Sequence, residues 1–168
     1  MPSASIIARL RRSRDRLLGR MDVQYYRSLG MAIGENVSIG PDCRLDPSTA
    51  WMITIGDNVV FAPGVHVLAH DASLRRRIGY TLIKHTLIGN NVFIGTGSII
   101  LPGVCIGDDV VVGAGSLVNR DIPSGTLSFG HPAEVIIPLA SYVRKMQTLL
   151  QQGNRYNEGT PGRILTLE

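Results

Sequence analysis

Residues 88–118 read IGNNVFIGTGSIILPGVCIGDDVVVGAGSLV, and an aliphatic residue returns in them at every sixth position. The same spacing occurs in two earlier blocks of the chain. The anchors of the three blocks are Ile33, Ile39 and Leu45; Ile55, Phe61 and Val67; and Ile88, Ile94, Ile100, Ile106, Val112 and Val118. A helix repeats every 3.6 residues and a strand every two, so a six-residue period predicts a short strand plus a turn in each unit.

Three such units would complete one triangular turn of a coil. Successive turns would stack at the roughly 4.8 Å spacing of hydrogen-bonded strands, with the anchors forming a ladder inside. Glycine follows many anchors, as at Gly89 and Gly107, and it suits tight corners. Polar pairs such as Asp108-Asp109 supply turn residues on the outside. The sequence therefore predicts an all-β fold, a parallel β-helix.

Composition indicates one soluble domain, because the chain has 168 residues, 44% hydrophobic and 18% charged. The two cysteines, Cys43 and Cys105, have no metal-type spacing and are too few for a disulfide framework, so we expect reduced thiols. No apolar run reaches the ~18 residues of a membrane-spanning helix. We expect a cytoplasmic protein and no metal site.

The net charge of +4 is concentrated near the start of the chain, since residues 1–30 hold seven arginines against two aspartates. We predict a basic helical segment over 1–30 whose charged face is solvated. Peripheral contact with the inner face of a membrane is the alternative. Nucleic acid is not an expected partner.

Both ends of a coil need covering elements, because they expose unpaired strand edges. Residues 137–168 follow the repeats, and their first part carries apolar residues at helical spacing. These are Leu139, Tyr142, Val143, Met146, Leu149 and Leu150. We predict a C-terminal helix that ends near Gly153 and packs across or beside the coil, then a mobile tail or an arm that reaches a neighbour.

Three strings identify a family resemblance over residues 31–136. They are IGDNVVFAPGV at 55–65, the run from 88 through NRDIP at 119–123, and FGHPAEVI at 129–136. Together they resemble the hexapeptide-repeat acetyltransferases, especially galactoside and maltose O-acetyltransferases and enzymes that modify polysaccharides. The resemblance implies a left-handed coil and a homotrimer. It also implies acetyl-CoA as cosubstrate, bound in the groove between neighbouring subunits.

The repeat breaks between Val67 and Ile88, which are 21 residues apart, so residues 68–87 should form a loop. Loops on rigid scaffolds often carry function. Acyl transfer to an alcohol needs a base, and His70 in this loop is the candidate, both by its chemistry and by resemblance. Asp71 is a candidate to support the imidazole. Lys84 and His85 are candidates for substrate contact.

Two further histidines have weaker claims. His66 is expected to face outward near a corner, and the side chain of His131 is expected to be incidental.

The donor-binding residues come from the resemblance alone. It implies that the backbone of Thr96 and of Ala114 grips the pantetheine arm, and that Asn119 and Arg120 match a Thr-Lys pair near the phosphates. Eighteen residues separate Thr96 from Ala114, which should stack them on adjacent turns. Glu134 stands where the galactoside enzymes carry an arginine, so we expect the nucleotide contacts to differ.

The sequence thus predicts direct acetyl transfer from acetyl-CoA to a hydroxyl of a sugar or polysaccharide precursor. Other acceptors, serine or an antibiotic, stay open. A metal enzyme similar to the γ-carbonic anhydrases is a further alternative, since that class uses the same coil and three histidines. The last is a noncatalytic scaffold that the basic N-terminal segment brings to a membrane.

Overall fold

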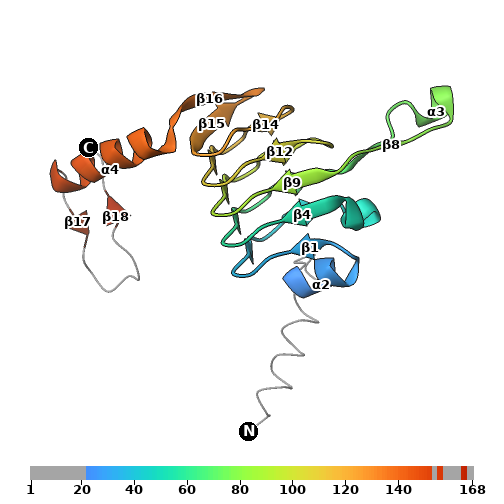
Figure 1. Ribbon diagram of the computed structural model, residues 1–168, viewed down its shortest axis with the longest axis horizontal. Coiled ribbons are helices and arrows are strands. Elements are labelled where there is room, and N and C mark those ends of the chain that lie inside the picture. Colours follow the sequence, from blue (N-terminus) through green and yellow to red (C-terminus); the bar gives the residue numbers. More distant parts are fainter. Residues whose placement is uncertain (1–21, 153–154, 157–163, 166–168) are drawn as a thin grey trace, which may run out of the picture.

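The computed structural model describes residues 22–152, 155–156 and 164–165, and most of these residues form a coil of very short parallel strands (Figure 1). Sheet A contains β1 (Ala32–Ile33), β4 (Ile53–Ile55), β9 (Thr86–Ile88) and β12 (Cys105–Ile106). Sheet B contains β2 (Ser38–Ile39), β5 (Val60–Phe61), β10 (Phe93–Ile94), β13 (Val111–Val112), β15 (Thr126–Gly130) and β16 (Ala133–Pro138). Sheet C contains β3 (Arg44–Leu45), β6 (His66–Val67), β11 (Ile99–Ile100) and β14 (Leu117–Val118). The predicted parallel β-helix is confirmed.

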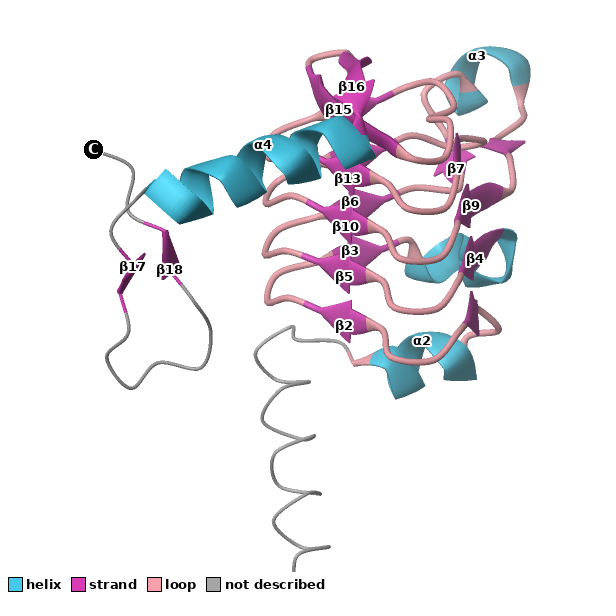
Figure 2. Cartoon of the chain, turned by 60° about the vertical axis from the view of Figure 1, so that its left-hand side comes forward, coloured by secondary structure: helices cyan, strands magenta, loops and turns pink. Residues whose placement is uncertain are grey.

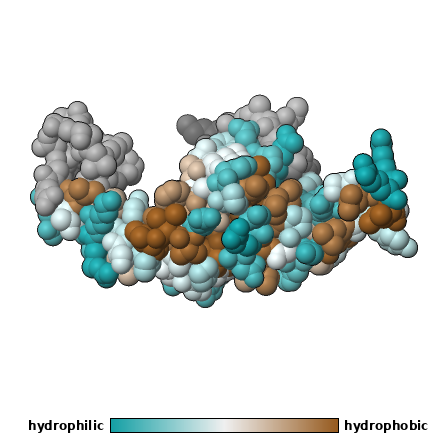
Figure 3. Space-filling model, turned by 90° about the horizontal axis from the view of Figure 1, so that it is seen from above, coloured by the Kyte–Doolittle hydropathy of each residue, from teal (hydrophilic) through white to brown (hydrophobic). Residues whose placement is uncertain are grey.

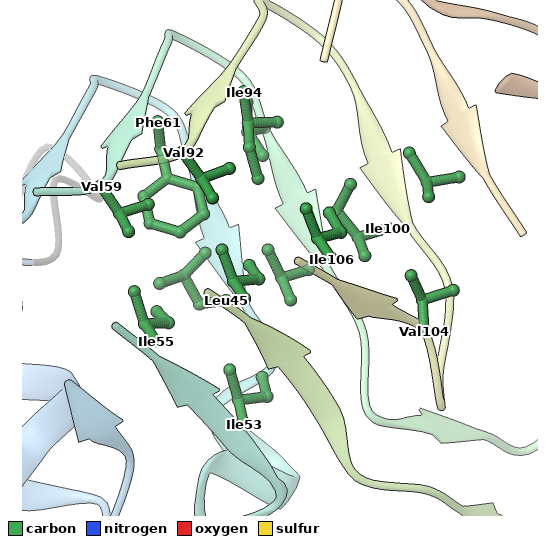
Figure 4. Packing of buried hydrophobic residues seen from close by; sticks show 14 of the residues in the cluster. Leu45, Ile53, Ile55, Val59, Phe61, Val92, Ile94, Ile100, Val104 and Ile106 are labelled. Atoms are coloured by element: carbon green, nitrogen blue, oxygen red, sulfur yellow. The ribbon is translucent and has the colours of Figure 1, made fainter. Parts of the chain in front are cut away.

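The six-residue anchors form the interior, as predicted. In sheet A, Ile33 lies beside Ile55, Ile55 beside Ile88, and Ile88 beside Ile106. Equivalent columns run through the other two sheets, and Figure 4 shows side chains from all three pointing at one another. Ile94, Ile100 and Val112 are completely buried. Stacked aliphatic side chains therefore hold the coil together by burial.

The corner between sheets A and B is stabilised by a ladder of amide side chains. Asn36, Asn58, Asn91 and Asp109 occupy equivalent positions on successive turns, each with φ between 53° and 58°. Asparagine and aspartate tolerate this left-handed conformation better than most residues. Each amide donates to the side-chain oxygen on the next turn, at 2.9, 3.1 and 3.1 Å. The corner thus gains hydrogen bonds in return for its backbone strain.

Separate elements cover the two ends of the coil. At the first turn, α2 (Val23–Ser28) places Tyr26 under the core with 1% of its surface exposed. The Tyr26 hydroxyl accepts a hydrogen bond from the backbone N–H of Leu45 at 3.1 Å. At the last turn, β16 runs antiparallel to β15 and turns back over the sheet edge.

The C-terminal helix, α4 (Leu139–Gln152), forms where the sequence predicts it. It contacts β15 and β16, but Figures 1 and 2 show that most of its length projects away from the coil instead of lying across it. The strands β17 (Arg155–Tyr156) and β18 (Ile164–Leu165) form an antiparallel pair beyond it. The rest of the predicted tail lies outside the described residues.

Only residues 22–30 of the predicted basic segment are described, so the expectation of a helix with a solvated basic face over 1–21 lies outside the described residues. Among the helices that the structure describes, none is long and apolar enough to cross a membrane.

Two segments interrupt the repeat, and both leave the coil at the corner between sheets C and A, which we call the C–A corner. The first is the 3-10 helix η1 (Pro47–Met52). The second is a hairpin arm made of β7 (His70–Asp71), the short helix α3 (Arg75–Ile78) and β8 (Leu82–Ile83). The arm is the predicted loop, and Figure 1 shows it extending from the coil at the far right.

Candidate active site

The arm is fixed to the coil at its base. The backbone N–H of Lys84 donates to the carbonyl of Ala69 at 2.9 Å, and β7 pairs antiparallel with β8. The buried Thr86 hydroxyl donates to the carbonyl of Leu68 at 2.8 Å and accepts from the N–H of Gly103. These bonds place His70, the first residue of β7, at the point where the chain leaves the coil.

His70 meets a carboxylate from the preceding turn. Its Nδ1 atom forms a short contact with Oδ2 of Asp46, the residue that caps η1. About one third of the His70 side chain is exposed, whereas only 3% of the Asp46 side chain is. The carboxylate is therefore shielded, while part of the imidazole reaches the surface.

Asp46 is held by the segment that it caps. Its oxygens accept from the hydroxyls of Ser48 and Thr49, both at 2.6 Å, from the N–H of Ser48 and from the N–H of Ala69. The Ser48 hydroxyl also lies 3.4 Å from Nδ1 of His70. The orientation of the carboxylate is thus fixed from several sides.

The charge of Asp46 follows from this environment. Burial alone raises the pKa of the carboxyl, but the hydrogen bonds outweigh burial and hold its pKa well below its usual range. The lowering bonds come from Ser48, Thr49, His70 and the N–H of Ala69. Asp46 is therefore ionised at neutral pH and faces Nδ1. A carboxylate at Nδ1 keeps the proton on that atom, which leaves Nε2 as the basic nitrogen.

Asp71, the sequence-based candidate to support His70, is engaged elsewhere. Its Oδ1 atom accepts from the N–H of Ser73 at 2.8 Å, and the residue is exposed. The Ser73 hydrogen bonds lower the pKa of Asp71, with a smaller contribution from the charge of His70. Adjacent residues in a strand point to opposite sides, so Asp71 points away from the imidazole of His70. The carboxylate in contact with the imidazole is that of Asp46.

Sequence reasoning missed Asp46, although a signal was present. Leu45 and Ile55 are ten residues apart where the repeat requires six, so this interval also contains an insertion. Asp46 directly precedes the inserted helix η1, on the same corner as the arm, and its N–H still donates to the carbonyl of Val67 on the next turn. The longer break at 68–87 holds more reactive side chains and is therefore the stronger signal in the sequence.

The candidates for substrate contact lie at the foot of the arm. His85 is exposed, and its Nε2 atom lies 2.9 Å from the hydroxyl of Thr54 on the outer face of sheet A. Lys84 is exposed, and its aliphatic stem lies against Gly103. His66 is half-buried in β6, where its neighbour Val67 points inward, so it faces outward as predicted.

The donor candidates occupy the next corner, between sheets B and C. Thr96 and Ala114 are exposed and lie on adjacent turns, since the N–H of Gly115 donates to the carbonyl of Thr96 at 2.8 Å. The predicted stacking is confirmed. A Cβ atom on Gly95 would lie 2.4 Å from the backbone nitrogen of Ala114, so only glycine allows these turns to approach.

Asn119 and Arg120 lie on the C–A corner of the last turn and are both exposed. The Nε of Arg120 donates to the Asn119 side chain at 3.5 Å. Within the described residues there is no group of three or more His, Cys, Asp or Glu side chains placed to hold a metal ion.

These features define a class, a parallel β-helix in which a buried carboxylate contacts a partly exposed histidine where the repeat is interrupted. A model of the bacterial transferase hexapeptide family, which spans six repeats, matches residues 85–120. Protein CapG of Staphylococcus aureus is 44% identical over 121 residues, which cover 66% of this chain and 70% of CapG. The chain therefore belongs to the bacterial transferase hexapeptide family, as its motifs predict.

Solved structures agree with this assignment. A maltose O-acetyltransferase from Clostridium difficile 630 is 32% identical with a TM-score of 0.58, over 73% of this chain and 81% of that one. A galactoside acetyltransferase in complex with coenzyme A is 28% identical with a TM-score of 0.55, over 72% and 71% of the two chains. The chain spans between 54% and 70% of the first curated relatives that it matches.

Proposed function

We propose that this protein transfers an acetyl group from acetyl-CoA to a hydroxyl group of a sugar or polysaccharide precursor. The observation that carries this proposal is the Asp46–His70 contact at the C–A corner of a hexapeptide transferase coil. The donor is supported by the coenzyme A complex of a similar acetyltransferase, and the acceptor by the maltose and galactoside enzymes.

The chemistry is direct transfer. Nε2 of His70 takes the proton of the acceptor hydroxyl while the hydroxyl oxygen attacks the thioester carbonyl. The tetrahedral intermediate collapses by breaking the carbon–sulfur bond, and the imidazolium returns its proton to the coenzyme A thiolate. Asp46 stays ionised throughout and stabilises the imidazolium through Nδ1. Backbone N–H groups near the thioester would stabilise the oxyanion.

The donor lies along the corner between sheets B and C in this proposal, gripped by the backbone of Thr96 and of Ala114. Both residues are exposed, and Gly95 keeps the two turns close. Asn119 and Arg120 lie near the donor phosphates, and the charge of Arg120 suits that role. Lys84 and His85, exposed at the foot of the arm, contact the acceptor.

A left-handed coil and a homotrimer with active sites between subunits complete the proposal. The chain order supports a shared site, because Thr96 precedes sheet C and His70 follows it, so one chain holds them at opposite edges of this sheet. A neighbouring subunit would bring a donor corner to the arm. Asp71 keeps at most an electrostatic role in this account.

The test measures thiol release from acetyl-CoA with a panel of sugars, nucleotide sugars, serine and hydroxyl-bearing antibiotics. We expect release that depends on a sugar and falls by about 10²- to 10⁴-fold in His70→Ala. His66→Ala is the matched control, because His66 faces outward on sheet C and should keep its activity. Transfer to serine or an antibiotic alone would contradict the acceptor class, and full activity of His70→Ala would contradict the base.

A further inference from the structure

The arm that begins with His70 carries a cluster of positive charge at its tip. Arg75, Arg76 and Arg77 form most of α3, and all three are exposed. Among the described residues, none of the three guanidinium groups forms a hydrogen bond or an ion pair, although backbone groups of Arg75 and Arg77 are hydrogen-bonded within the arm. Figure 3 shows this tip at the right-hand end of the molecule, where strongly hydrophilic atoms adjoin hydrophobic ones. We call these three residues the arginine cluster.

Nearby acidic groups do not neutralise the cluster. Residues 68–87 contain four basic side chains and one carboxylate, that of Asp71. Asp71 accepts the Ser73 N–H, and Asp46 faces His70. Asp121, on the same corner at the last turn, accepts the N–H of Cys105 at 2.8 Å.

Most other carboxylates of the repeat units lie at the corner between sheets A and B, across the width of sheet A. Glu35, Asp57, Asp108 and Asp109 all lie there. Asp42 lies at the corner between sheets B and C. The local field around the arm is therefore positive, and it would raise the local concentration of an anion.

The arginine cluster lies close enough to His70 for one acceptor molecule to contact both. Arg75 follows His70 by five positions, which limits the distance between their Cα atoms to roughly 17 Å, and arginine has a long side chain. A guanidinium presents a fork of donors that matches phosphate and carboxylate oxygens. An acceptor with its hydroxyl at Nε2 and an anionic group several ångströms away fits this arrangement.

We propose that the acceptor is anionic, a sugar that bears a phosphate or carboxylate group, and that the arginine cluster binds this group while the hydroxyl lies at His70. This inference rests on the proposed function and narrows its substrate class. The cluster recognises the acceptor by charge, so neutral sugars are poorer substrates.

A matched pair of acceptors tests this. Methyl α-D-galactoside is neutral, whereas α-D-galactose 1-phosphate carries the same free hydroxyls and an anionic group. We expect kcat/KM for the phosphate to exceed that for the methyl galactoside by about tenfold at low salt, and to approach it as ionic strength rises.

The triple variant R75Q/R76Q/R77Q isolates the cluster. We expect it to lose the preference for the phosphate while keeping its activity on the methyl galactoside, its KM for acetyl-CoA and its oligomeric state. R75K/R76K/R77K keeps the charge and should keep most of the preference.

Three results with the glutamine variant would overturn the inference. One is an unchanged preference in the glutamine variant. Another is a raised KM for acetyl-CoA, which would assign the cluster to the donor phosphates. The third is a change of oligomeric state, which would assign it to a subunit contact. Turnover of the methyl galactoside without a preference would sink only this inference, whereas no turnover of any sugar would sink the proposed function with it.

Discussion

The regular turns from β9 to β14 and the interrupted C–A corner follow different rules. Between Ile88 and Ile106 each residue has a place in the repeat, and its side chain stacks in the core, faces outward from a strand or forms a corner. At the C–A corner, η1 and the arm depart from the repeat and bring together Asp46, Ser48 and His70. Repetition therefore builds the scaffold, and the insertions supply reactive groups.

The largest effect on stability is expected in the regular turns. Ile100→Ala removes a fully buried side chain from the ladder and should lower the free energy of unfolding by about 2–5 kcal/mol, measured by urea denaturation. Its activity per folded molecule should stay close to that of the wild type. Ile99→Ala, in the same strand but facing outward, is the control, and an equal loss there would contradict the assigned ladder.

A smaller and pH-dependent loss is expected at the interrupted corner. Asp46→Asn should destabilise the protein by about 1–3 kcal/mol at pH 7, since it replaces a buried carboxylate by a neutral amide and weakens the hydrogen bonds that the carboxylate accepts. The folded pKa of Asp46 is lowered, so wild-type stability from this group is present above its unfolded pKa and is lost as the pH falls.

The difference between wild type and Asp46→Asn should therefore shrink below about pH 4, near the unfolded value of aspartate. Urea denaturation across pH 2.5–7 measures it. A difference that stays constant over this range would mean that the carboxylate is not stabilised as an ion.

The amide ladder should contribute less. Asn91→Ala removes side-chain hydrogen bonds and leaves an alanine at φ 55°, which should lower stability by about 1–2 kcal/mol. Asn91→Gly removes the same bonds but tolerates the backbone conformation. It should lose less than the alanine variant in thermal unfolding, and the reverse order would argue against strain at this corner.

The smallest effect should come from the exposed carboxylate next to the base. Asp71→Asn should change kcat/KM by no more than about twofold, because Asp71 contacts Ser73 and not the imidazole. If Asp71→Asn lowered kcat/KM as much as Asp46→Asn does, Asp71 would be the residue that supports His70.

The sequence predicted the scaffold well, because each anchor is specified locally by its place in a six-residue unit. It also located the arm and His70, since a long break in a repeat is visible in one dimension. It could not show which carboxylate supports His70, because Asp46 and His70 lie 24 residues apart and meet only when adjacent turns stack. The direction of α4 relative to the coil could not be predicted either, since an amphipathic pattern shows that a helix has an apolar face but not what that face packs against.

The most direct test of the account is a double-mutant cycle on Asp46 and His70. It measures kcat/KM at pH 7 for wild type, Asp46→Asn, His70→Ala and the double variant, with acetyl-CoA and the best sugar acceptor. Because Asp46 acts only through His70 in this account, the double variant should match His70→Ala within about twofold. Losses that multiply instead would show that the two residues act independently, and would contradict the proposed pair.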